Sequence, residues 1–240
     1  MNKSENQTTT ENTNSARQEE SAQVPRIDGS YILTEIGSVL SLKKGILLTI
    51  RELLLRQAEN IRAFLREDRF RLVKPVIFVI FCSFLYTILQ QTLGFDDGYS
   101  QFMEDDNNST AYKIIFWIQA NYGYANIAMA LFVAIWIRLF FRRYNYNYWE
   151  ILIMLLYVFG TMMIIGVLLG IIEIAVGVKT ALYTNIIGFI YITWATGQFF
   201  NGKKWFNYVK AFFAYLLGSM TATIVALVIG ILVDSLKGIN

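Results

Sequence analysis

Long apolar segments separated by short polar ones fill the second two thirds of the chain. Five of them are each close to the about 20 residues that a helix needs to cross a hydrocarbon core of about 30 Å. They are residues 75–93, 122–141, 151–176, 181–200 and 206–233. Because a backbone in lipid must satisfy its own hydrogen bonds, this pattern predicts an all-α fold, a polytopic transmembrane bundle of five helices over residues 75–236.

The segments before the first span are polar or amphipathic. Residues 1–30 are rich in Asn, Thr, Ser, Gln and Glu and lack an apolar run, so we expect a disordered tail and no signal peptide. Residues 31–74 contain a short helical pattern from Tyr31 to Leu42 and a stronger one from Ile46 to Arg66. The stronger pattern predicts a basic amphipathic helix on the cytoplasmic membrane surface. Its apolar arc consists of Ile46, Ile50, Leu53, Leu54, Ile61, Phe64 and Leu65, with Leu48 and Leu55 breaking the pattern.

Basic residues are concentrated on one side of the predicted spans. A five-span topology places fifteen flanking Lys and Arg on the side of the N-terminal segment and three on the opposite side. The first loop on the opposite side is acidic, with Asp96, Asp97, Glu104, Asp105 and Asp106. Since cytoplasmic loops carry an excess of Lys and Arg, we predict the N-terminus inside and the C-terminus outside. Adding or removing one span would put a basic cluster on the wrong side.

Composition limits the chemistry that the chain can perform. Its residues are 55% hydrophobic and 16% charged, far from the soluble norm. The net charge of +3 is uneven, since the first 74 residues hold 12 of the 21 Lys and Arg, and this indicates a membrane surface and not nucleic acid. With no His and a single Cys82, Cys/His zinc sites and Ser-His-Asp or Cys-His catalysis are excluded. We therefore expect no enzyme activity, no cofactor and no metal.

Small residues recur every four positions along the last span, and a pair has the same spacing in the third. Such a stripe lets another helix approach closely. Two alternatives remain open from the spacing, namely packing within the bundle and a homodimer face. The residues are Gly166 and Gly170 in the third span, and Ala214, Gly218, Ala222, Ala226 and Gly230 in the last.

Glu173 is the carboxylate inside an apolar run, and an intramembrane ionisable group is a functional hypothesis by default. At 1.5 Å per residue it lies roughly 33 Å along its segment, near the outer interface. It is either a solvated or capping group or a proton or cation site. Neutral polar residues near the outer ends either line a cavity or join helices by hydrogen bonds. They are Gln90, Gln91, Gln119, Asn121, Asn126, Thr184 and Asn185.

The basic residues before the first span are candidates for contact with anionic lipid headgroups, each contributing about 1 kcal/mol near the surface. The alternative is that they only orient the protein. The candidates are Arg51, Arg62, Arg66, Arg69, Arg71 and Lys74.

Residues 45–89 resemble an uncharacterised bacterial integral-membrane family, known as a domain of unknown function and often preceded by a zinc ribbon. Residues 145–157 are similar to the family's aromatic-acidic entry into a later span. The zinc ribbon is missing here, and Ile151 replaces a His. The resemblance implies a multi-span bacterial membrane protein and no particular activity. The positions that carry it are Gly45, Thr49, Ile61, Arg62, Arg69, Arg71 and Pro75.

The leading hypothesis is an integral protein of the bacterial cytoplasmic (inner) membrane that acts as a non-enzymatic scaffold or partner-binding module. Its expected partners are the bilayer, anionic lipids at the cytoplasmic face, and a second copy or another membrane protein. The alternative is a small transporter or channel component, favoured by Glu173 and the outer polar residues. The lack of an internal repeat weakens that alternative.

Overall fold

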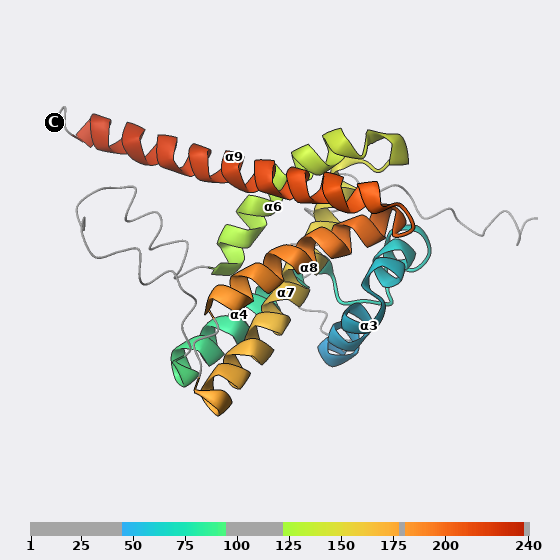
Figure 1. The fold of residues 1–240 in the computed structure, drawn as a ribbon, viewed down its shortest axis with the longest axis horizontal. Coiled ribbons are helices and arrows are strands. Elements are labelled where there is room, and N and C mark those ends of the chain that lie inside the picture. The colour runs from blue at the N-terminus through green and yellow to red at the C-terminus, as the bar shows by residue number, and fades with distance from the viewer. Residues whose placement is uncertain (1–44, 95–121, 178–180, 238–240) are drawn as a thin grey trace, which may run out of the picture.

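The computed structural model describes residues 45–94, 122–177 and 181–237, and these residues form helices and no strand. The tail over residues 1–30, the short helix over 31–42 and the first outer loop, with Gln119 and Asn121, lie outside the described residues. The all-α prediction is confirmed for the described part of the chain. Its helices are α3 (Ile46–Arg66), α4 (Pro75–Leu93), α6 (Tyr122–Phe140), the short 3-10 helix η2 (Arg142–Tyr144), α7 (Tyr148–Val176), α8 (Ala181–Asn201) and α9 (Trp205–Lys237) (Figure 1).

Three of these helices are long and apolar enough to cross a membrane. They are α4, α7 and the part of α9 from Trp205 to Val233. The stretch Tyr124–Phe140 of α6 is apolar but shorter. Length and composition therefore indicate a membrane protein. Helices α6 and α8 occupy the two other predicted spans, and their crossing of a bilayer remains a prediction.

Local sequence signals fix where α4 and α7 begin and end. Pro75 opens α4, where its missing N–H has no helical partner in any case, and Gly94 ends it in the left-handed conformation at φ 70°. A capping box opens α7, because Asn147 Oδ1 accepts from the backbone N–H of Glu150 at 2.8 Å and Glu150 Oε2 accepts from that of Asn147 at 2.7 Å. Gly177 closes α7 in the left-handed conformation.

Helix α7 forms the centre of the bundle and packs against α3, α4, α6 and α8. Every residue from Ile151 to Thr161 is buried, whereas Leu168, Ile171 and Ile172 near the other end are exposed. Figure 1 shows α9 crossing this group of helices and extending beyond it at its C-terminal end. The core therefore surrounds the N-terminal half of α7.

Glycines on α7 and α9 allow neighbouring helices to approach closely. A Cβ atom on Gly160 would lie 2.6 Å from the ring of Phe78 in α4, and one on Gly166 would lie 3.1 Å from the ring of Tyr86. A Cβ atom on Gly218 would lie 2.6 Å from the Cα atom of Val133, so the backbones of α6 and α9 are in contact there. These contacts belong to packing within the bundle.

The ladder of small residues on α9 is therefore used in part inside the molecule. Ala214 and Gly218 are buried in the contact with neighbouring helices. Farther along, Ala222 and Ala226 are half-buried and Gly230 is buried, as is Gly170 in α7. A homodimer contact along the outer half of the ladder stays a prediction.

Helix α3 is kinked, and this changes its ion pairs. Arg56 has non-helical backbone angles of φ −143° and ψ 55°. The sequence spacing favours a pair between Glu52 and Arg56, but Glu52 instead accepts from Arg71 at 3.0 Å, while Arg56 lies 3.9 Å from Glu59. The expectation was wrong because a four-residue pair requires an unbroken helical turn.

Candidate functional site: the contact of helix α3 with α7 and α8

One side of α3 is buried against α7 and α8, and it carries polar as well as apolar residues. Leu53, Ile61 and Phe64 supply the apolar part, and Phe64 meets the ring of Tyr157 edge-to-face at 5.3 Å between centroids. Gln57 and Asn60 lie on the same side and are 4% exposed each. A buried amide needs hydrogen-bond partners. Asn60 Nδ2 donates within α3 to the carbonyl oxygen of Glu52 at 2.8 Å, so Gln57 marks the specific part of the contact.

Gln57 sits between α7 and α8. The hydroxyl of Tyr191 in α8 donates to Gln57 Oε1 at 2.6 Å, and Gln57 Nε2 approaches Thr161 Oγ1 in α7 at 3.5 Å. Thr161 in turn donates to the carbonyl oxygen of Tyr157 at 2.8 Å. One side chain thus joins three helices. The groups are all neutral, so the network positions α3 and carries no charge.

Arg62 attaches the C-terminal half of α3 to the end of α8. Its guanidinium donates to the carbonyl oxygens of Gln198 and Phe199 at 3.0 and 2.9 Å. These carbonyls belong to the last turn of α8, which has no helical donors of its own and forms the negative end of the helix dipole. A positive group there stabilises both α8 and the docking of α3.

The N-terminal half of α3 is tied to the residues that precede α4. The backbone N–H of Val73 donates to Thr49 Oγ1 at 3.0 Å, and the Glu52–Arg71 pair joins the same two segments. Tyr157 of α7 donates its hydroxyl to the carbonyl oxygen of Val73 at 2.7 Å. Since α4 begins at Pro75, two residues later, these bonds hold this half of α3 next to the start of α4.

The predicted lipid-contacting residues therefore differ in their surroundings. Arg62 is engaged by α8 and Arg71 by Glu52, whereas Arg51 is exposed. Arg69 and Lys74 are half-buried. Their contact with anionic lipid stays a prediction.

The side chain of Arg66, in the last turn of α3, lies over an aromatic ring. Its guanidinium carbon lies 5.1 Å from the centroid of the Tyr146 ring, a cation–π contact. Burial raises the pKa of Tyr146, an effect that the positive charges of Arg66 and Arg62 oppose. The tyrosine therefore remains a neutral platform at physiological pH.

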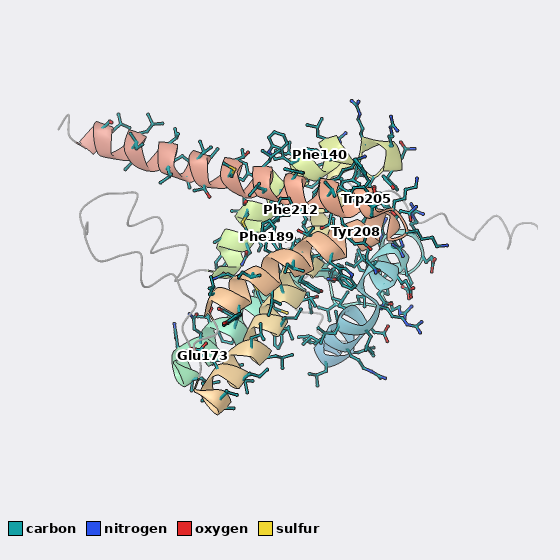
Figure 2. The ribbon with its side chains drawn as sticks, in the orientation of Figure 1. Phe140, Glu173, Phe189, Trp205, Tyr208 and Phe212 are labelled. Atoms are coloured by element: carbon teal, nitrogen blue, oxygen red, sulfur yellow. The ribbon has the colours of Figure 1, made fainter. Side chains whose placement is uncertain are left out.

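Glu173 lies away from this contact. It is half-buried in the last turn of α7, and its carbonyl oxygen accepts from the N–H of Gly177 at 2.8 Å. Figure 2 shows Glu173 near the C-terminal end of α7. Trp205 and Tyr208, at the start of α9, lie on the opposite side of the group of helices. Among the neutral polar residues of the outer ends, Asn126 is buried, Gln90 and Thr184 are half-buried, and Gln91 and Asn185 are exposed.

Among the described residues, no three His, Cys, Asp or Glu side chains are close enough to hold a metal ion. No protein-family model matches the chain, and neither does any curated protein or solved structure. The class is therefore defined by the structure itself: the described residues form helices and no strand, and three of these helices are suited to crossing a membrane.

The sequence contained a signal for the Gln57 contact that hydropathy alone does not register. At 100° per residue, Gln57 and Asn60 fall on the same side as Leu53 and Ile61. Polar residues on the apolar side of an amphipathic helix predict a protein contact, because lipid would leave their amides unpaired. The partners of Gln57 on α7 and α8 follow only from the tertiary structure, whereas Asn60 donates within α3 to the carbonyl oxygen of Glu52.

Replacing Gln57 by leucine is expected to destabilise the docking of α3 by about 1 to 3 kcal/mol, because the Tyr191 hydroxyl loses its acceptor in a buried site. Tyr191→Phe removes the other partner. The loss of stability in the double variant is expected to be smaller than the sum of the losses in the two single variants. Thermal unfolding of the four purified proteins in detergent measures this, and strict additivity would contradict the bond.

Proposed function

We propose that this chain is a five-span protein of the bacterial cytoplasmic membrane, with its N-terminus inside and its C-terminus outside, and that it acts as a non-enzymatic scaffold or partner-binding module. In this proposal α4, α6, α7, α8 and α9 cross the bilayer and α3 is a cytoplasmic amphipathic helix docked on the bundle. The resemblance of residues 45–89 to an uncharacterised bacterial membrane family supports the same class.

The contacts between two basic loops support this orientation. Tyr144, beside Arg142 and Arg143, accepts a hydrogen bond from Asn207 Nδ2 at 2.8 Å. Phe141 and Phe200 stack at 4.0 Å between centroids in the same region. The loops after α6 and after α8 therefore lie at one end of the bundle, where the excess of Lys and Arg favours the cytoplasm.

The apolar filling of the bundle centre is the observation that carries the scaffold proposal. The buried residues in the N-terminal third of α7, where this centre lies, include Ile153, Met154, Leu155 and Leu156, which pack against the surrounding helices. A transport route through this region would need polar groups that replace the hydration of its substrate. A centre packed with aliphatic side chains therefore favours a scaffold over a transporter or channel.

In-membrane crosslinking with mass spectrometry tests the proposal. A photoreactive amino acid in place of Arg56, whose side chain is 76% exposed on α3, is expected to capture a reproducible protein neighbour in native cells carrying a tagged copy. The matched control places the same probe at Ile172, which is 51% exposed near the other end of α7 and is expected to capture lipid.

Two outcomes would count against the proposal. Capture of lipid and of the protein itself alone would leave no partner for a scaffold. Specific substrate flux by the purified protein in liposomes would replace the scaffold by a transporter, and loss of that flux in Glu173→Gln would assign the residue a role in it.

A further inference from the structure

Helix α3 has a second apolar side that faces away from the protein. Leu47 is 82% exposed and Leu55 is 69% exposed, and Leu48 and Leu54 are exposed as well. At 100° per residue, these four leucines fall within an arc of about 120°. Thr49 and Leu53, which are buried, lie on the opposite side. We refer to the four leucines as the leucine face.

Arg51 projects from the middle of the leucine face. Its position is about 40° from Leu47 and about 40° from Leu55, and its side chain is exposed. A long basic side chain within an apolar stripe can place its charge at headgroup level while its stem covers apolar surface. Glu52, the acidic residue next to it, is paired with Arg71, so the exposed charge of this segment is positive.

The leucine face is also held at a defined depth. Val73 and Arg71 bind Thr49 and Glu52, and α4 begins at Pro75. If α4 crosses the bilayer, the residues before Pro75 lie at the membrane surface, and the first half of α3 lies there with them. The kink at Arg56 separates this half from the half that Arg62 attaches to α8.

We propose that the leucine face of α3 is a lipid-binding site that inserts into the inner leaflet, with Arg51 contacting the phosphate of an anionic phospholipid. The proposal rests on the membrane orientation given above. It assigns lipid contact to Leu47, Leu48, Arg51, Leu54 and Leu55, and it assigns Arg62 and Arg71 to contacts within the protein. The leucines match the acyl chains of the leaflet, and the arginine between them matches its anionic headgroups.

Spin labels on the full chain in vesicles of phosphatidylglycerol and phosphatidylethanolamine test the insertion. Cys82 is fully buried, so the reagent modifies an introduced cysteine. Labels at Leu54→Cys and Leu55→Cys are expected to show a several-fold higher ratio of oxygen to nickel-chelate collisions than a label at Glu59→Cys. The control is apt because the Glu59 side chain is 67% exposed and lies on the same helix.

Either of two results overturns the insertion. Equal nickel access at Leu54, Leu55 and Glu59 would place the leucine face in water. Shielding of both leucine positions from oxygen and nickel alike would show a protein contact, with a second copy as the available partner in such vesicles.

The role of Arg51 is tested separately by native mass spectrometry of bound phosphatidylglycerol. Arg51→Gln is expected to weaken retention of this lipid about five-fold, the effect of one basic residue near an anionic surface. Arg56→Gln, which lies off the leucine face, is expected to have no effect. Equal retention by Arg51→Gln and the unmodified protein would remove Arg51 from the site.

The two proposals fail in different ways. Substrate flux in liposomes would overturn the scaffold function and leave the inserted leucine face intact. Nickel access at the leucines, together with a captured partner at Arg56, would overturn the inserted leucine face and leave the scaffold function intact.

Discussion

Replacing Gly218 by leucine is expected to separate α6 from α9 and to lower the stability of the protein by about 3 kcal/mol, the upper end of the cost of overpacking. The first added atom, Cβ, would lie 2.6 Å from the Cα atom of Val133. A side chain could rotate away, but backbone cannot, so the two helices must move apart. Thermal unfolding in detergent is expected to shift down by about 6 to 12 °C.

The control is Ala226→Leu, which makes a similar change two turns farther along the same stripe. Ala226 is half-buried, and its neighbours Leu227 and Val228 are exposed. We expect Gly218→Leu to lower the unfolding temperature far more than Ala226→Leu. A dimer that dissociates in Ala226→Leu would add a homodimer role for the outer half of the stripe, whereas unchanged stability in Gly218→Leu would contradict the α6–α9 contact.

Replacing Arg62 by methionine is expected to release α3 from the bundle while the other helices stay folded. The variant keeps an unbranched apolar stem but leaves the Gln198 and Phe199 carbonyls without their charged donor. Hydrogen bonds to charged groups contribute about 1.5 to 3 kcal/mol, and one nitrogen serves both carbonyls here, so we expect a loss of about 2 to 3 kcal/mol.

Amide hydrogen exchange distinguishes this local release from general unfolding. The amides of α3 are expected to exchange about 30 to 160 times faster in Arg62→Met, the equivalent of that free energy. The amides of α7 are expected to keep their protection. Arg56→Met serves as the control, because Arg56 is exposed and its nearest acid is 3.9 Å away. Equal exchange in all three proteins would show that Arg62 does not hold α3.

Hydropathy predicted the helical class and the position of each long apolar helix that the structure describes, because about 20 apolar residues allow few alternatives to a helix. Hydropathy did not set the start of α7, which begins at Tyr148 behind the Asn147 cap and not at the predicted Ile151. The five apolar segments predict five helices that cross the bilayer, and the alternation of loop charge agrees with that number. Among the described residues, three helices are long and apolar enough to cross.

The candidate site was less accessible to sequence reasoning. The basic residues were grouped by charge, but Arg62 and Arg51 have opposite surroundings, one bound by α8 and the other exposed. Periodicity placed Leu54 on the apolar arc and treated Leu48 and Leu55 as exceptions, whereas all three are exposed. A single apolar arc cannot describe a helix whose buried side and exposed side both carry apolar residues.

The long-range bonds of α3 also have a consequence for biosynthesis. Arg62 and Phe199 are 137 positions apart, and Gln57 and Thr161 are 104 apart. At a synthesis rate of 5 to 20 residues per second, the ribosome needs roughly 7 to 27 s to make the chain between Arg62 and its acceptor. The partners of Arg62 on α8 do not exist during that time. The attachment of α3 to α8 is therefore a late step, which follows the synthesis of four intervening helices among those that the structure describes, namely α4, α6, η2 and α7.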